Sequence, residues 1–116
     1  MEYKLIVYRQ DIFKLIEQYP IISKILLTSN DEFSCQQLNN LTIDNDYLNE
    51  YIYQRLCLNN NYHRLNNHHL IKNELLNITL ECIIEHHIIT IIAPDKRNIF
   101  FDIIYQKSKN YVIMLE

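Results

Sequence analysis

The sequence of 116 residues contains no glycine and no tryptophan, and only two prolines. Phosphate-binding loops and dinucleotide-binding fingerprints need glycine at fixed positions, so those nucleotide-binding motifs are excluded. The longest apolar runs are far shorter than the roughly 18 residues of a membrane helix, and the N-terminus lacks the pattern of a signal peptide. Without glycine, we expect asparagine or aspartate wherever the backbone needs a positive φ.

Cysteine is also scarce, and Cys35, Cys57 and Cys82 form an odd set without the paired spacing of a disulfide framework. We therefore expect buried free thiols in the reducing interior of a cell. The formal net charge of -3 argues against a protein whose main task is to bind nucleic acid phosphates. The length and a hydrophobic content of 48% predict one ordinary soluble globular domain.

The apolar pattern of the first half predicts an α+β domain with a small N-terminal sheet. Residues 3–7 and 41–43 are predicted strands, and residues 11–15 fit either their hairpin partner or the start of a helix. Apolar positions at helical spacing then predict a helix that begins near Pro20 and a second helix over 47–56, preceded by capping residues.

The second half is predicted to be helical, which gives the chain a helical majority. Residues 62–67 are predicted as a loop. Residues 70–92 are ambiguous, but polar residues recur every four positions and strand-like alternation fails at three Ile-Ile pairs, which favours a helix. A further helix is expected from Pro94, and residues 111–115 remain undecided.

The chemistry-bearing residues do not form a convincing active site. Adjacent histidines on a helix do not clamp one metal ion, so we expect all five histidines at exposed helix edges. Glu81 and Glu85 could form a carboxylate pair but fit a solvated helix face better, and Tyr47, Tyr51 and Tyr53 fit core packing. We expect no catalytic residue, no metal and no cofactor.

Three short segments carry a resemblance to a known family. Lys4-Leu5 is followed at family spacing by residues 11–15, Leu76-Asn77-Ile78 lies in the middle, and Pro94 precedes Phe101-Asp102-Ile103 by six residues. In order and spacing these segments resemble the Skp adaptor family (S-phase kinase-associated protein of SCF ubiquitin ligases), whose BTB/POZ-type fold is shared with elongin C. The chain departs from the family at Glu74-Leu75, where members have Asn-Tyr.

The resemblance implies a non-catalytic adaptor, cytoplasmic and nuclear, that links an F-box protein to a cullin scaffold. Residues 1–92 would form the BTB/POZ-like domain and face the cullin through Asn73, Glu74 and Leu75. Residues 93–116 would form a C-terminal helical extension of the same unit that holds the F-box helix. Its binding residues would be Pro94, Ile99, Phe100, Phe101, Ile103, Ile104, Tyr105 and Val112.

Two interpretations of this apolar C-terminal segment remain open. It holds more apolar side chains than one small helical end can hide, which favours a partner surface. Alternatively, these residues complete the core, and the chain is a homo-oligomeric BTB-like or viral-type interaction module without a role in ubiquitin transfer. In both cases we expect no nucleic acid or membrane partner, and a homodimer where the partner is absent.

Overall fold

The computed structural model describes residues 1–19, 21, 36, 40–85, 88–108 and 111–114. The six strands form one antiparallel sheet in the order β2-β3-β4-β5-β1-β6. The elements in chain order are β1 (Glu2–Val7), α1 (Gln10–Gln18), α4 (Asn45–Leu56), β2 (Tyr62–Leu65), β3 (His68–Asn73), β4 (Ile78–Glu85), β5 (Ile88–Ile92), α5 (Ile99–Lys107) and β6 (Tyr111–Met114).

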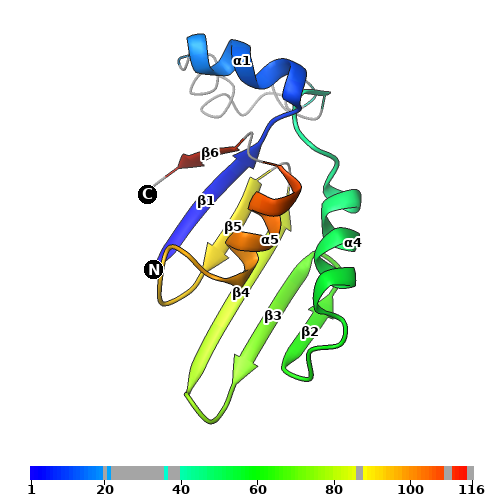
Figure 1. Cartoon of the computed structure of the whole chain (residues 1–116), viewed down its shortest axis with the longest axis vertical. Coiled ribbons are helices and arrows are strands. Elements are labelled where there is room, and N and C mark those ends of the chain that lie inside the picture. The colour runs from blue at the N-terminus through cyan, green and yellow to red at the C-terminus, as the bar shows by residue number, and fades with distance from the viewer. Residues whose placement is uncertain (20, 22–35, 37–39, 86–87, 109–110, 115–116) are drawn as a thin grey trace.

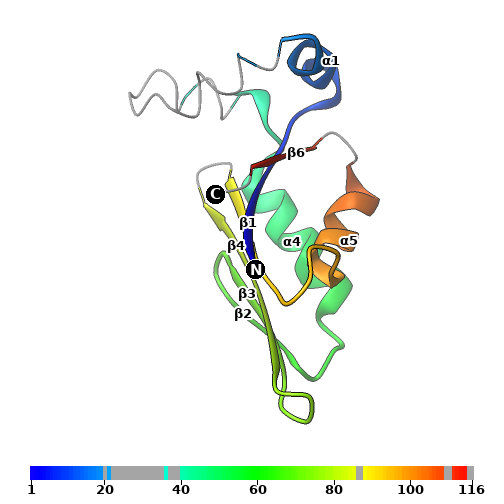
Figure 2. The same cartoon turned by 90° about the vertical axis from the view of Figure 1, so that its left-hand side faces the viewer.

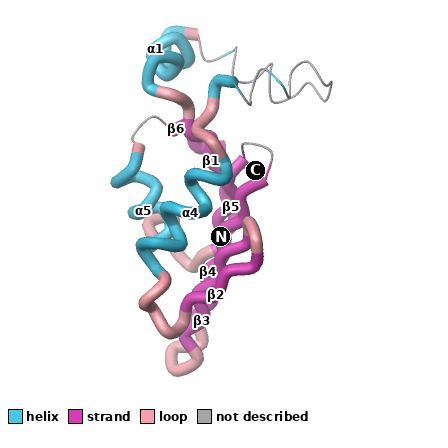
Figure 3. Tube along the Cα trace, turned by 90° about the vertical axis from the view of Figure 1, so that its right-hand side faces the viewer, coloured by secondary structure: helices cyan, strands magenta, loops and turns pink. Residues whose placement is uncertain are grey.

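The molecule has two layers, with helices α4 and α5 packed on one face of the sheet (Figure 1). Seen along the sheet, both helices lie on the same side, and α1 lies beyond one end of the strands (Figures 2 and 3). Within the described part of the chain, no helix covers the opposite face of β2, β3 and β4. We call that uncovered side the open face.

The main hydrophobic core lies between the sheet and the two helices. Alternate residues of each strand point into it, because successive side chains of a strand face opposite sides. Tyr3, Leu5 and Ile91 from the sheet and Phe100 from α5 are completely buried there. A domain with an α+β architecture is therefore confirmed, although the described residues do not confirm a helical majority or a BTB/POZ fold.

The predicted first strand is confirmed as β1. For residues 11–15 the hairpin strand is wrong and the helix start is confirmed, because these residues lie in α1. Ile12, Phe13 and Ile16 follow the spacing of a helix face and pack against Ile6 and Tyr8 in a second, smaller cluster. This burial over the end of β1 stabilises the helix, since a hairpin strand would place Ile12 and Phe13 on opposite faces.

The predicted strand at 41–43 is reduced to one isolated bridge between Tyr8 and Thr42. Backbone hydrogen bonds from Arg9 N to Leu41 O (2.9 Å) and from Ile43 N to Val7 O (3.0 Å) flank that bridge. The pairing goes no further, because α4 begins two residues after Ile43. The predicted helix from Pro20 lies outside the described residues, whereas the predicted helix at 47–56 is confirmed as α4.

The helix predicted over residues 70–92 is wrong, since this segment forms most of β3, β4 and β5. Ile-Ile pairs broke the alternation because one isoleucine of each pair faces the core and the other faces the opposite side. Ile84, Ile89 and Ile91 are buried, whereas Ile83 and Ile92 are only partly covered. The predicted loop at 62–67 is likewise wrong in its first part, which forms β2.

The expectation for positive-φ positions is confirmed, because the two such residues in the described chain are Asn66 (φ 57°) and Asn77 (φ 51°). Asn66 begins the two-residue loop between β2 and β3, and Asn77 ends the four-residue loop between β3 and β4. Asparagine tolerates the left-handed region better than other residues with a Cβ, so it replaces glycine in both hairpins.

The C-terminal helix is confirmed but begins at Ile99, five residues after Pro94. The Asn98 side chain accepts a hydrogen bond from Phe101 N (3.0 Å) and caps the helix, while its amide donates to Tyr3 Oη (3.0 Å). Tyr3 in turn donates to the carbonyl of Lys96. These bonds tie the loop before α5 to β1 and fix the start of the helix. Of the undecided segment at 111–115, the described residues Tyr111–Met114 form β6, which pairs with β1.

Candidate functional site

A buried polar network connects α4, β2 and β3. The Tyr62 hydroxyl lies 2.6 Å from His69 Nδ1, and His69 Nε2 lies 2.8 Å from Asn49 Oδ1. Because the Asn49 oxygen can only accept, His69 carries its proton on Nε2 and Nδ1 accepts from the tyrosine. All three side chains are buried, and His69 is 0% exposed. The expectation that all histidines are exposed is therefore wrong for His69.

Burial shifts the pKa values of both titratable members of this network. Desolvation, and to a smaller extent the nearby Arg64 guanidinium, lower the pKa of His69 to about 4. Desolvation raises the pKa of Tyr62 to about 12. Both groups are neutral near pH 7, and both ring nitrogens of His69 have a hydrogen-bond partner, so the network stabilises the packing of α4 on the sheet.

Cys82 of β4 pairs with His69 of β3, and its thiol is also fully buried. Burial raises the pKa of the Cys82 thiol far above its usual value, which suppresses the reactive thiolate. The prediction of buried free thiols is confirmed for Cys82 and wrong for Cys57, which is exposed at the end of α4. Cys35, His86 and His87 lie outside the described residues. His63 is exposed as predicted, but it lies in β2 and not at a helix edge.

The apolar residues that the resemblance assigns to F-box binding lie largely in the core. Phe100, Phe101, Ile103 and Ile104 are buried between α5 and the sheet, with at most 6% of each exposed. Their side chains therefore do not line an empty trough in this structure. The remaining members are exposed Pro94, Ile99 at 40% exposure, half-buried Tyr105, and Val112, which lies in β6 opposite Ile6.

A shallow cleft of about 460 Å³ lies between α4 and α5. Ile99 and Ile103 form part of its wall, together with Leu56 of α4. Arg55 of α4 donates a hydrogen bond to the Gln106 side chain of α5. Of the eight predicted F-box-binding residues, this cleft brings together Ile99 and Ile103 only.

The three residues assigned to the cullin lie at the tip of the β3–β4 hairpin, where Asn73 ends β3 and Glu74 and Leu75 begin the loop. Leu75 is 98% exposed and its neighbour Leu76 is 67% exposed. Hydrogen bonds from Leu76 N to Asn73 Oδ1 (3.2 Å) and from Asn77 N to Glu74 O (3.3 Å) hold the loop. The hairpin therefore presents two adjacent leucines on an ordered turn.

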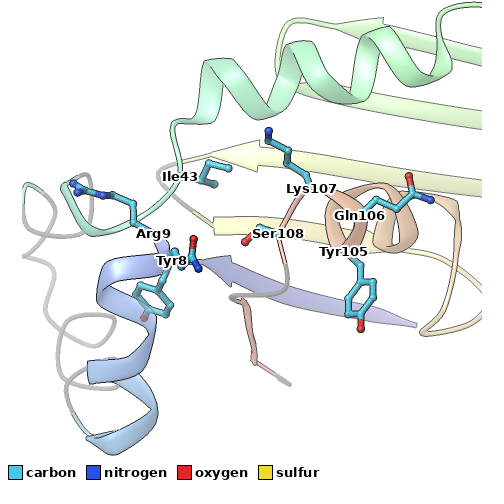
Figure 4. Close-up of a pocket in the computed structure, with 8 residues that line it drawn as sticks. Tyr8, Arg9, Ile43, Tyr105, Gln106, Lys107 and Ser108 are labelled. Carbon is cyan, nitrogen blue, oxygen red and sulfur yellow. The ribbon is translucent and has the colours of Figure 1, made fainter.

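A larger cleft of about 530 Å³ separates the start of α1 from the end of α5 (Figure 4). Two cationic side chains come from its borders, but both have partners. Arg9 bonds Asp11 (3.0 Å) and the carbonyl of Asn40 (3.1 Å). The Lys107 ammonium lies 4.8 Å from the centroid of the Tyr47 ring, and a hydrogen bond with Tyr47 raises the pKa of Lys107. Neither cationic side chain at the border of this cleft is therefore available to bind an anionic ligand.

Glu81 and Glu85 lie in the strand β4 and point to the open face, so the helix expected for them is wrong, although Glu85 is exposed and Glu81 is partly exposed. No group of three or more His, Cys, Asp or Glu side chains gathers at metal-binding distance within the described residues. None of the described helices is long and apolar enough to cross a membrane. No protein-family model and no curated protein matches this sequence.

The residues that sequence reasoning missed are Asn49, Tyr62 and His69. The strand register could have identified them, because Tyr62 and His69 occupy inward positions of β2 and β3, next to buried Ile71. A polar residue at an inward strand position requires a buried partner. This pattern was not recognised in the sequence because residues 62–67 were predicted as a loop and residues 70–92 as a helix.

Proposed function

We propose that this chain is a non-catalytic protein-interaction module that contacts its partner through the tip of the β3–β4 hairpin. The observation that carries the proposal is the exposure of Leu75 (98%) and Leu76 (67%) on a hydrogen-bonded turn. Adjacent leucines that the domain does not bury itself are typical anchors for a pocket on another protein.

The chemistry of the interior supports the non-catalytic part of the proposal. The groups that resemble catalytic residues in kind, His69, Tyr62 and Cys82, are buried, and their pKa values are shifted toward the neutral forms. A general base or nucleophile needs contact with substrate and a pKa near the working pH. A role in packing agrees better with these features.

The resemblance identifies a cullin as the first partner to test at this tip. Asn73, Glu74 and Leu75 are the residues it assigns to the cullin, and the tip leaves Glu74 and Leu75 open to contact. In this form of the proposal the chain is an SCF-type adaptor. The exposed leucine would replace the family's Asn-Tyr contact with an apolar one.

Binding of an F-box helix is a second candidate function, favoured by the cleft between α4 and α5. Ile99, 40% exposed, and Ile103 line this cleft, and its rim carries Asp102 and Gln106. A helix docked there would cover Ile99 without displacing the buried Phe100 and Ile104. This location differs from the trough that the sequence suggested.

Binding measurements with purified components test the proposal. The unmodified protein is expected to bind a cullin amino-terminal domain, and the double variant Leu75→Glu/Leu76→Glu is expected to bind at least about tenfold more weakly. The matched control is Leu15→Glu in α1, a half-exposed leucine at the opposite end of the molecule (Figure 1). The control variant is expected to bind like the unmodified protein.

Two outcomes would contradict the proposal in different ways. Equal binding by the tip variant and the unmodified protein would show that the hairpin is not the contact. No binding of any cullin by the unmodified protein would reject the adaptor form. In that case, the proteins that the unmodified chain captures from its own cells, and the tip variant does not, identify the partner class.

A further inference from the structure

The exposed hairpin tip forms one wall of a further cleft, which has a volume of about 480 Å³. This cleft lies between the loop that joins α4 to β2 and the end of the β3–β4 hairpin, and we call it the tip cleft. It is lined by Asn60 and Asn61 of that loop, His63 of β2 and residues 72–75 of the hairpin. Leu75 therefore lies beside a hollow and not on a flat surface.

Hydrogen bonds hold both walls of the tip cleft in place. Lys72 N donates to Asn61 O (3.1 Å), which ties the loop to β3. Within the loop, Asn61 N donates to Asn59 Oδ1 (2.9 Å). Within the hairpin, Leu76 N donates to Asn73 Oδ1 (3.2 Å). A site whose walls are already ordered loses less conformational freedom when it binds a ligand.

An exposed leucine lies on each of the two loops that flank the tip cleft. Leu58 belongs to the loop from α4 to β2 and is 94% exposed, and Leu75 of the hairpin is 98% exposed. Both loops lie at the same end of the molecule (Figure 1). Burial of such apolar side chains by a partner is favourable. This end of the molecule therefore offers apolar contacts on both sides of a polar hollow.

The polar side chains of the tip cleft are mainly hydrogen-bond donors. Lys72 is exposed, and its ammonium has no hydrogen bond or ion pair within the described residues. Asn73 Oδ1 accepts from Leu76 N, so the amide N–H groups of Asn73 remain to donate. His63 shares the face of Lys72, because it pairs with Leu70, two positions before Lys72 in β3.

We propose that the tip cleft binds a carboxylate of the partner, from an aspartate or glutamate that lies next to an apolar residue in the partner's chain. This inference rests on the proposed function and names the class of segment that the hairpin tip recognises. The carboxylate accepts hydrogen bonds from the Lys72 ammonium and the Asn73 amide, while its apolar neighbour packs against Leu75. Hydrogen bonds that involve charged groups are shorter and stronger than those between neutral groups.

Charge also restricts which segments the tip cleft accepts. A lysine or arginine in place of the carboxylate would face Lys72, and this repulsion selects against such a partner. Glu74 lies at the hairpin end of the same cleft and repels a second carboxylate. The site therefore matches a segment with a single acidic residue and not a strongly acidic tail.

A displayed library of random peptides tests this inference without a known partner. Peptides that bind the unmodified protein, but not the Leu75→Glu/Leu76→Glu variant, are expected to carry an aspartate or glutamate beside a leucine, isoleucine or phenylalanine. One such peptide, made by synthesis, is expected to bind Lys72→Glu about fivefold more weakly and Lys72→Gln about twofold more weakly. Glu74→Gln removes a repulsion and is expected to strengthen binding about twofold.

Two controls separate a charge effect from a loss of folding. Lys14→Glu reverses the charge of an exposed lysine in α1 and is expected to bind the peptide like the unmodified protein. The same peptide with its acidic residue replaced by lysine is expected to bind Lys72→Glu more tightly than the unmodified protein. A misfolded variant would not gain affinity in this way.

The inference and the hairpin proposal can fail separately. Selected peptides that need Leu75 and Leu76 but carry no carboxylate, or that bind Lys72→Glu as tightly as the unmodified protein, would overturn the inference and leave the leucine contact standing. Acidic peptides that need Lys72 but bind the leucine variant unchanged would support the carboxylate site and reject the leucine contact. If the unmodified protein selects no peptide, the inference is overturned, and the cullin measurement alone decides the proposed function.

Discussion

The two faces of the sheet are made from the same strands but differ in how far their side chains are buried and in whether their polar groups are hydrogen-bonded within the chain. Toward α4 and α5, Tyr3, Leu5 and Ile91 are completely buried, and the polar groups of Asn49 and His69 bond each other. On the open face, apolar and charged side chains are mixed and partly exposed. The face toward α4 and α5 is therefore buried by this chain alone.

The difference indicates where a partner would bind. Isoleucines occur on both faces, so hydrophobicity alone does not separate them. The two faces differ in the exposed fraction of their side chains. Cys82 and Ile91 face the core at 0% exposure, whereas Leu65 on the other face is 74% exposed. A surface that alternates apolar and charged side chains remains soluble and can still bind another protein.

The largest expected effect comes from two neighbouring isoleucines of β5. Ile91→Ala opens a cavity in the closed core and is expected to lower the free energy of unfolding by about 2–5 kcal/mol. Ile92→Ala, on the open face, is expected to cost about 1 kcal/mol, since its side chain is already partly hydrated. Urea denaturation at low protein concentration measures both values.

Equal losses of unfolding free energy in Ile91→Ala and Ile92→Ala would contradict the difference between the two faces of the sheet. They would mean that the open face is covered within the single chain, because only a closed environment makes the second isoleucine as costly to truncate as the first.

A smaller effect is expected from acidification, through His69. Its pKa is about 4 in the folded protein, and an unfolded histidine titrates near 6.5. Between these values the unfolded chain binds a proton that the folded protein excludes. The free energy of unfolding should therefore fall by about 3 kcal/mol as the pH falls from about 6.5 to 4, and this contribution should level off below pH 4.

Urea denaturation as a function of pH measures this contribution. His69→Gln should remove the slope between pH 6.5 and 4, whatever its effect on overall stability. His63→Gln is the matched control, because His63 is exposed and should leave the slope unchanged. A slope that persists in His69→Gln would assign the pH dependence to other groups.

The sequence predicted two elements from compact apolar patterns, although β1 buries Leu5 on one face and Ile6 on the other. The stripe from Tyr47 to Leu56 predicted α4, and the short N-terminal run predicted β1. Prediction failed for β3, β4 and β5 because Ile83 and Ile92 add apolar side chains to the open face. Apolar residues on both faces erase the period of two that identifies a strand.

The candidate sites depended on the same error. Glu81 and Glu85 share a face in a helix and in a strand, so their spacing could not distinguish the two structures. The exposure of Leu75 could not be predicted either, because a hairpin tip and a helix place that residue in different surroundings. Phe100 and Ile104 were expected on a partner surface because the sheet that covers them was not predicted.

The smallest expected effect concerns the loops, where a substitution adds no side chain to either face. At Asn77, with φ 51°, glycine relieves the cost of a Cβ in the left-handed region but adds freedom to the unfolded chain. Asn77→Gly is therefore expected to change the free energy of unfolding by less than about 1 kcal/mol. Asn77→Val, with a β-branched side chain in that region, is expected to lose about 1–2 kcal/mol.

Urea denaturation of both variants provides the baseline for the isoleucine comparison. If Asn77→Gly lost as much stability as Ile91→Ala, backbone effects would be as large as core effects in this glycine-free chain. The two faces could then not be compared through side-chain truncation. The left-handed conformation of Asn77 argues against that outcome, since glycine adopts it at no steric cost.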